Sequence, residues 1–147
     1  MFQRTYKVNG EDVNDFMVMQ NVAYLNYSSK LVETFLFVKG FTKLKMNTLK
    51  VGLQKNNDQI KQYQQLLFTQ FFSVKLEFKN LGFCEQKMNI AIHFFNQKEE
   101  LCATVNREIY WFDYTSWETV CPPKTIAKYF LKKEEFLNVL ILLRTIS

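Results

Sequence analysis

The sequence predicts an α+β domain in which an antiparallel sheet wraps around one long central helix. Two observations carry this prediction. The segment 20–39 repeats apolar side chains at helical spacing over a broad face. Several later segments alternate apolar and polar side chains with the period of a half-buried strand. A strand, a long apolar helix and then a run of antiparallel strands are best buried as a curved sheet filled by its own helix.

Composition and length place the chain among single globular domains. Hydrophobic residues make up 48% and charged residues 22% of the 147 positions, which excludes an intrinsically disordered chain. The 15 Phe, 7 Tyr and 2 Trp supply a large apolar content for one core, so we expect one domain over 1–147. The longest apolar run, 139–143, is far shorter than the roughly 20 residues of a membrane helix, so no membrane span is expected.

The first predicted elements are a strand and a loop. Apolar and polar side chains alternate over 2–8, as in a strand, and Asn9-Gly10 is a turn signal. The next segment, 11–16, is crowded with side chains that bind backbone N–H groups and disfavour a strand. We therefore expect a loop that carries carboxylates immediately before the central helix.

The central helix is predicted over 20–39. Its apolar stripe is wide enough to belong inside a core rather than on a surface. Gln20 or Asn21 lies near its start, and Gly40 stands where a left-handed residue commonly ends a helix.

Strands are predicted for most of the chain beyond the helix. A strand over 49–54 is followed by a turn or bulge at 56–58 and by a continuation over 59–65. The clearest alternation then falls in three successive segments, which form a meander with turns at Leu81-Gly82 and 96–99: 72–79, 87–94 and 101–112.

The last part of the chain predicts an irregular segment and a helix. The segment 113–121 has no clear period, and Pro122-Pro123 ends any extended run. Apolar side chains then return at helical spacing, which predicts a C-terminal helix over about 124–144. An edge strand of the predicted sheet can pair with a second copy of the chain, so we expect a homodimer or a homotetramer.

Cysteine and histidine usage offers no metal or redox motif. Cys84, Cys102 and Cys121 include no Cys-x-x-Cys pair and are too scattered for a disulfide framework, so we expect reduced, structural thiols. His93 is the only histidine and lies within a strand pattern, where a packed or surface role is favoured over a catalytic one. We expect no metal site.

The charge of the chain is mildly basic. The net charge is +5, and the lysines are spread along the sequence without an arginine-rich run. This favours a solvated surface over a nucleic-acid or acidic-protein binder, so we expect no nucleic-acid partner. The first residues lack an apolar signal region, and the expected location is therefore cytoplasmic.

Three segments carry a resemblance to a known family. The segment 12–27 resembles the pattern Asp-x-Asp-x-x-Gly-His-Val-Asn-Asn-x-x-Tyr-Leu-x-Tyr, with matches at Asp12, Asn21, Tyr24, Leu25 and Tyr27. The segment 63–74 is similar to Tyr-x-x-Pro-x-x-x-Gly-Asp-x-Leu-x-Val, and Trp111-Phe112-Asp113 with Pro122-Pro123 is similar to a final strand and a closing proline. These patterns belong to the 4-hydroxybenzoyl-CoA thioesterase-like acyl-CoA thioesterases, which have the hotdog fold, and the resemblance covers about residues 2–132.

The resemblance implies hydrolysis of an acyl-CoA or acyl-carrier thioester. Such chemistry needs a carboxylate that activates water, and N–H donors for the oxyanion, which the first turn of the central helix offers. No cofactor is implied beyond the coenzyme A of the substrate, whose phosphates surface lysines would meet. Gln20 and Asn21 are candidates for orienting the substrate and Tyr24 for lining its acyl site, with helix capping and core packing as the alternative roles.

The sequence departs from the family at the catalytic position itself. In the family, the second Asp of the pattern carries the catalytic carboxylate. The corresponding residue here is Asn14, and an amide cannot act as nucleophile or general base at neutral pH. Gly-His falls on Met17-Val18, and the Pro and Gly-Asp of the second pattern fall on Leu66 and Thr69-Gln70.

Three other carboxylates are candidates for the missing one. Asp12 and Asp15 lie within two residues of Asn14, and Glu33 is the only acid on the predicted helix. Their alternative roles are a loop or turn carboxylate for the first two and a structural ion for the third. If none of them serves, the chain is a hotdog protein that binds acyl thioesters or acts in an assembly without hydrolysis.

Overall fold

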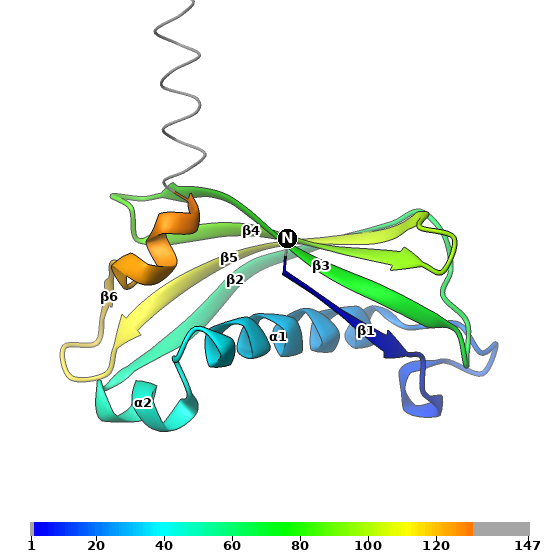
Figure 1. Cartoon of the computed structure of the whole chain (residues 1–147), viewed down its shortest axis with the longest axis horizontal. Helices are drawn as coiled ribbons and strands as arrows, with labels where there is room; N and C mark the ends of the chain where they lie inside the picture. Colours follow the sequence, from blue (N-terminus) through cyan, green and yellow to red (C-terminus); the bar gives the residue numbers. More distant parts are fainter. Residues whose placement is uncertain (1, 131–147) are drawn as a thin grey trace, which may run out of the picture.

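The computed structural model describes residues 2–130, which form an antiparallel sheet curving over one long helix (Figure 1). This confirms the predicted α+β class. The elements in chain order are β1 (Phe2–Lys7), the 3-10 turn η1 (Gly10–Asp12), α1 (Asn21–Val38), α2 (Lys43–Thr48), β2 (Val51–Gln62), β3 (Phe71–Gly82), β4 (Lys87–Asn96), β5 (Leu101–Asp113) and β6 (Glu118–Val120).

The strand order in the sheet is β1-β3-β4-β5-β2, and every neighbouring pair is antiparallel. The predicted meander is therefore present as β3-β4-β5, and β1 and β2 are the two edges. β6 pairs with β5 just beyond the end of β4, because Tyr110 faces Lys87 of β4 and the next residue, Trp111, faces Val120 of β6.

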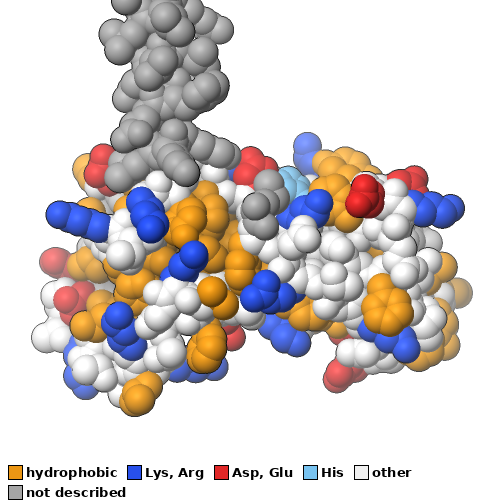
Figure 2. Space-filling view, viewed as in Figure 1, with side chains coloured by type: hydrophobic (Ala, Val, Ile, Leu, Met, Phe, Trp, Pro, Cys, Tyr) orange, Lys and Arg blue, Asp and Glu red, His pale blue; other side chains and the backbone are white. Residues whose placement is uncertain are grey.

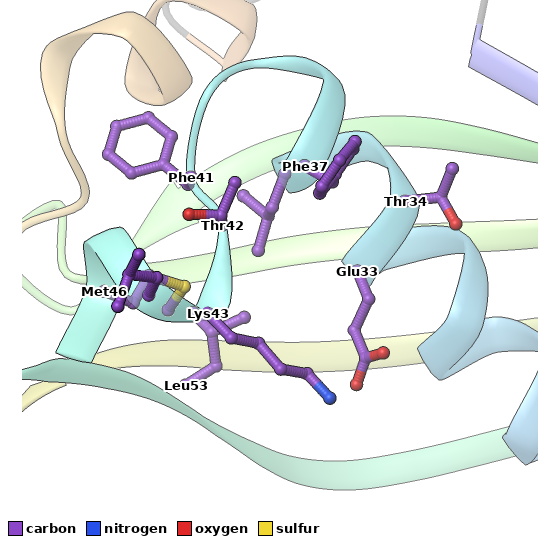
Figure 3. A pocket seen from close by; sticks show the side chains of 10 residues that line it. Glu33, Thr34, Phe37, Phe41, Thr42, Lys43, Met46 and Leu53 are labelled. Carbon is purple, nitrogen blue, oxygen red and sulfur yellow. The ribbon is translucent and has the colours of Figure 1, made fainter.

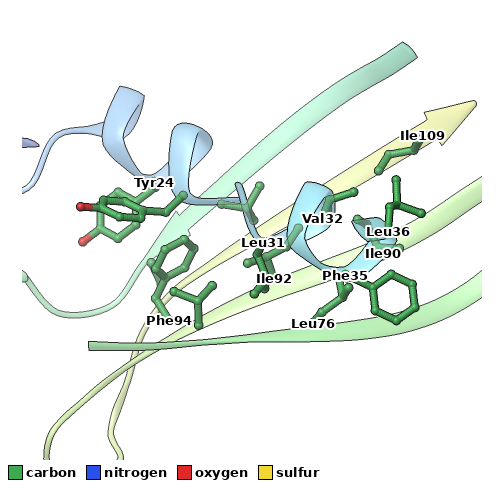
Figure 4. Close-up of a cluster of buried hydrophobic side chains, with 14 of the residues drawn as sticks. Tyr24, Leu31, Val32, Phe35, Leu36, Leu76, Ile90, Ile92, Phe94 and Ile109 are labelled. Atoms are coloured by element: carbon green, nitrogen blue, oxygen red, sulfur yellow. The ribbon is translucent and has the colours of Figure 1, made fainter. Parts of the chain in front are cut away.

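The core lies between α1 and the concave face of the sheet. The face of α1 toward the sheet carries Tyr24, Leu31 and Phe35, all buried, and Figure 4 shows them opposite side chains from three strands. Those side chains are Leu76 from β3, Ile90, Ile92 and Phe94 from β4, and Ile109 from β5. The broad apolar stripe predicted for this helix is thus used for packing.

The outer stripe of α1 is uncovered by the rest of the described chain. It consists of Val22, Asn26, Lys30, Glu33 and Phe37, spaced three or four residues apart and all exposed. The described sheet covers one side of the helix only, so this stripe faces away from the core.

Two element predictions needed correction, and one open alternative is decided. β2 runs through 56–58 as one strand, with a bulge between Asn56 and Gln59, so the bulge alternative is correct. Leu81-Gly82 is not a turn, because Gly82 still pairs with Lys87, and the turn follows at 83–86. The segment 113–121, expected to be irregular, contains β6.

The sequence analysis also missed α2, a helix of six residues. Its first turn is stabilised by the Thr42 hydroxyl, which accepts a hydrogen bond from the Lys45 amide at 3.1 Å. Six residues are too few to show a helical period, so a local cap rather than a pattern defines this element.

Helical structure begins at 124, as predicted, and the described chain ends at 130, so the predicted continuation to 144 lies outside the described residues. Tyr129 and Phe130 both pack on Phe78 of β3, with ring centroids 5.1 and 5.2 Å away. This turn therefore closes one end of the core. Among the described helices, none has the length and apolar character needed to cross a membrane.

Candidate functional site

The N-terminus of α1 offers backbone donors that have no acceptor within residues 2–130. Ala23 and Tyr24 donate their amides to the Gln20 carbonyl, at 3.0 and 3.3 Å. The amides of Asn21 and Val22 precede them in the first turn, where no intrahelical carbonyl can reach them. Because the helix dipole adds partial positive charge at this end, these two amides can stabilise a developing oxyanion.

The loop before α1 is tied to the helix through Asp12. Its Oδ2 accepts hydrogen bonds from the Tyr27 hydroxyl at 2.6 Å and from the Asn9 amide at 2.9 Å. Burial, and then the neighbouring Asp12 carboxylate, raises the pKa of Tyr27, so the phenol stays protonated and continues to donate. Asp12 therefore serves as an anchor of the loop.

Replacing Tyr27 with phenylalanine is expected to lower the free energy of unfolding by about 1.5–3 kcal/mol, because a part-buried carboxylate loses a charge-assisted hydrogen bond. Urea unfolding measures this change. The matched control is Tyr63→Phe, since Tyr63 is exposed and makes no hydrogen bond through its hydroxyl within residues 2–130. Equal losses in both variants would contradict the anchor role.

Asn14 holds the turn that follows this anchor. Its Oδ1 accepts hydrogen bonds from the amides of Phe16 at 2.9 Å and Val18 at 3.2 Å, and its carbonyl accepts one from Met17. An amide oxygen is sufficient for this structural work. Asp15 sits at the tip of the turn, exposed, with no hydrogen bond or ion pair to any residue in the described part of the chain. Of the two candidate carboxylates in the loop, Asp12 is thus engaged and Asp15 is unoccupied among the described residues.

Two residues other than glycine have the positive φ that favours glycine. Met17 falls where the first resembled pattern has Gly, and Thr69 does so for the second pattern when its Leu-x-Val end is aligned with Phe72 and Val74. Their φ angles are 64° and 73°. The two loops also pair with each other: the Phe68 amide donates to the Met17 carbonyl, and Val18 forms a bridge with Leu67. The conformation that the pattern requires is therefore preserved although its usual residue is not.

Replacing Thr69 with glycine is expected to raise the free energy of unfolding by about 0.5–1 kcal/mol. A β-branched residue is strained at positive φ, and relief of that strain outweighs the added freedom of the unfolded chain. Gly40→Ala is the opposite control, because Gly40 has φ 92° and open space around its Cα. Urea midpoints compare the two variants, and a destabilised Thr69→Gly would contradict the strain.

The three predicted substrate-binding residues occupy different environments. Gln20 is the N-cap residue and is exposed, but its side chain does not cap the helix. The Asn21 side chain accepts a hydrogen bond from the Gln62 amide group at the end of β2. Tyr24 is fully buried against Phe94, and burial raises its pKa to about 12. Core packing accounts for Tyr24, whereas Gln20 and Asn21 are exposed at the start of α1.

Glu33 lies at the other end of α1, on the mouth of a cavity of about 700 Å³ (Figure 3). The apolar lining comes from the end of α1, the loop that follows it, α2 and β2, namely Leu36, Phe37, Phe41, Leu44, Met46 and Leu53. The Glu33 carboxylate and the Lys43 ammonium group extend toward the same opening (Figure 3). A cavity of this size and lining suits an apolar ligand with a polar group at its entrance.

The helix keeps these two places apart. Asn21 and Glu33 are separated by twelve helical residues, which corresponds to about 18 Å along the axis. Within one chain, therefore, Glu33 cannot act on a carbonyl that is bound by the first amides of α1. Asp12, Asn14 and Asp15 thus lie in the loop that leads into α1, Gln20 and Asn21 lie at the start of the helix, and Glu33 lies in a second candidate site.

Sequence reasoning missed a buried ion pair beside α1. Arg107 of β5 binds Asp58 of β2 through two hydrogen bonds, Nε to Oδ1 at 2.8 Å and Nη2 to Oδ2 at 3.0 Å. The guanidinium also reaches the Ser29 hydroxyl at 3.0 Å and the Leu25 carbonyl at 3.3 Å, so it joins the helix to the bulge of the edge strand.

The two tryptophans lie in opposite environments near the cavity end of the sheet. Trp111 of β5 is 1% exposed, and its ring meets Phe41, a cavity residue, at a centroid distance of 5.6 Å. Trp117, in the turn before β6, is 73% exposed. Only Trp111 is therefore coupled by packing to the cavity wall.

The basic side chains form no single patch on the face shown in Figure 2, where blue groups are scattered among apolar and neutral ones. Within the described residues, no cluster of His, Cys, Asp and Glu is arranged to hold a metal ion. His93 lies on the outer face of the sheet. Its Nε2 is hydrogen-bonded to the Glu77 carboxylate at 2.7 Å, and its Nδ1 to the Thr104 hydroxyl at 3.0 Å.

The structure is similar to solved CoA thioesterases, although the sequence matches no family model and no curated protein. A hypothetical protein of Staphylococcus aureus solved in complex with CoA has a TM-score of 0.79 at 14% identity, covering 89% of this chain and 82% of its own. A 1,4-dihydroxy-2-naphthoyl-CoA thioesterase from Synechocystis has a TM-score of 0.78 at 11% identity, covering 88% and 95%. YbaW, a probable thioesterase from Escherichia coli, has a TM-score of 0.72 at 12% identity, covering 82% and 89%. At these identities the likeness establishes the hotdog fold expected from the resemblance.

Proposed function

We propose that this hotdog protein hydrolyses the thioester bond of an acyl-CoA, or of an acyl group on a carrier, at the N-terminus of α1. Asp15 takes a proton from water as the water oxygen attacks the carbonyl carbon. The amides of Asn21 and Val22 receive the oxyanion. The bond from carbon to sulfur then breaks, and the proton held by Asp15 passes to the departing thiolate.

One observation carries this proposal. The free first amides of an 18-residue helix adjoin a loop with an unoccupied carboxylate, in a fold shared with proteins whose solved structures are CoA thioesterases. The exposed side chains of Gln20 and Asn21 flank the same amides and would orient the substrate. Asp12 contributes by holding the loop, because its Oδ2 is already shared by two donors.

The second candidate function is binding of acyl thioesters without hydrolysis. It is favoured by Asn14, which replaces the carboxylate of the resembled pattern and whose Oδ1 accepts hydrogen bonds from the amides of Phe16 and Val18. In that case the cavity beside Glu33 would hold the acyl group, and no general base would be needed.

The proposal extends to assembly and location. The edge strands β1 and β2 and the outer stripe of α1 are uncovered in the described chain, so pairing with a second copy would bury them in a homodimer or a homotetramer. A cytoplasmic location agrees with the three free cysteines.

The test is thiol release from short, medium, long and aromatic acyl-CoAs, followed with a thiol reagent, beside calorimetric binding of the same compounds. Turnover of any of them by the wild-type chain supports hydrolysis. Saturable binding without turnover, in protein shown to be folded by circular dichroism, supports the binding function instead. Neither binding nor turnover across the panel contradicts both.

A further inference from the structure

Cys84 and Cys121 are two exposed thiols that the fold places side by side. Cys84 lies in the turn between β3 and β4, and Cys121 directly follows β6. The Sγ atom of Cys121 is 3.9 Å from the carbonyl oxygen of Cys84, although the residues are 37 positions apart in sequence.

A second contact shows that this approach involves two segments rather than one atom. The Thr119 hydroxyl donates to the side-chain oxygen of Gln86 at 2.7 Å. Residue 84 thus lies by residue 121, and residue 86 by residue 119, so the turn and the end of β6 are in contact at two points.

The third cysteine has the opposite character. Cys102 is buried in β5, and its thiol donates to the Glu100 carbonyl at 3.5 Å. Burial raises the pKa of the Cys102 thiol, so the reactive thiolate is disfavoured there. Exposure therefore distinguishes Cys84 and Cys121 from Cys102 as targets of an oxidant.

We propose that Cys84 and Cys121 are a redox modification site that closes reversibly to an intramolecular disulfide. With a peroxide as oxidant, one thiolate attacks the peroxide oxygen, giving a sulfenic acid and water. The second thiolate attacks that sulfur and displaces the oxygen, which leaves as a second water. Two thiols and one peroxide thus become one disulfide and two waters, and a dithiol reductant reverses the bond by exchange.

The bond joins the turn after β3 to the segment that leads into the helical turn at 124. It closes a loop that contains all of β4, β5 and β6, which constrains the unfolded chain and stabilises the native one. The site lies away from the N-terminus of α1, so the inference is independent of the proposed hydrolysis.

The experiment treats the reduced full-length chain with hydrogen peroxide in native buffer and follows intact mass and peptide maps. The expected product is a monomeric chain lighter by its two thiol hydrogens, with Cys84 and Cys121 peptides linked and the mass restored by dithiothreitol. Its urea midpoint is higher than that of the reduced chain. Formation is at least about tenfold faster in the folded chain than in urea, because the fold has already closed the loop.

Single variants supply the controls. Cys84→Ser and Cys121→Ser abolish the linked peptide, whereas Cys102→Ser retains it. The proposal is overturned if the linkage includes Cys102, if only disulfides between chains form, or if the bond appears in urea but not in native buffer.

Discussion

Replacing Asp15 with asparagine is expected to lower kcat/KM for acyl-CoA hydrolysis by about 10²–10⁴-fold, the contribution of a general base. Asp15 is exposed and makes no polar contact with other described residues, so the variant keeps its fold. Thiol release across a range of acyl-CoA concentrations gives kcat and KM separately. We expect the loss in kcat, because removal of the base affects the transition state rather than binding.

Asn14→Asp is the matched variant that adds a carboxylate. One oxygen of the new carboxylate can accept the hydrogen bonds from Phe16 and Val18, and the other remains free to act on water. Introduced together with Asp15→Asn, it is expected to recover turnover.

Glu33→Gln is expected to leave kcat unchanged, because Glu33 lies about 18 Å along α1 from the first amides of the helix. Loss of turnover in Glu33→Gln alone would move the chemistry to the cavity.

Replacing Asp58 with asparagine is expected to lower the free energy of unfolding by about 3 kcal/mol, because it leaves the guanidinium of Arg107 buried without its counter-charge. The Arg107 side chain is 2% exposed, and two of its four hydrogen bonds go to Asp58. Lys55→Met is the control, since the Lys55 side chain is 51% exposed and its contact with Asp58 contributes at most about 1 kcal/mol. Urea unfolding at pH 7 measures both, and equal small losses would contradict the account.

The same pair predicts a pH dependence of stability. Burial acts to raise the pKa of Asp58, but the hydrogen bonds and charge of Arg107, with a smaller effect of Lys55, outweigh it and hold the pKa below its usual 3.8. A carboxyl group with a depressed native pKa stabilises the fold above its unfolded value and loses that contribution as pH falls through the native one. Wild type should therefore lose its advantage over Asp58→Asn below about pH 4, and urea midpoints from pH 7 to 3 would record this.

Long periodic elements could be predicted from the sequence, whereas contacts between distant segments could not. The alternation in β3, β4 and β5 and the apolar stripe of α1 each extend over ten or more residues, enough to define a period. The pairing of Arg107 with Asp58 crosses 49 positions and depends on the register of β2 with β5.

For the candidate site too, one part could be predicted from the sequence and another could not. The resemblance aligned position 14 with the catalytic carboxylate of the pattern, and the residue type of Asn14 then showed that the carboxylate is missing. The hydrogen bonds that occupy Asp12 and leave Asp15 unoccupied depend on the loop conformation, which no pattern in the sequence encodes. The cavity beside Glu33 was missed for a related reason, since α2, which forms part of its wall, is too short to predict.

The unequal tryptophans give the chain an intrinsic optical probe. In Trp117→Phe, Trp111 is the only indole, shielded from solvent and in contact with Phe41 of the cavity wall. A ligand that enters the cavity moves Phe41 against this indole and changes its emission, whereas one confined to the N-terminus of α1 leaves the emission unaltered. Fluorescence titration of that variant can therefore locate a bound acyl group without any label.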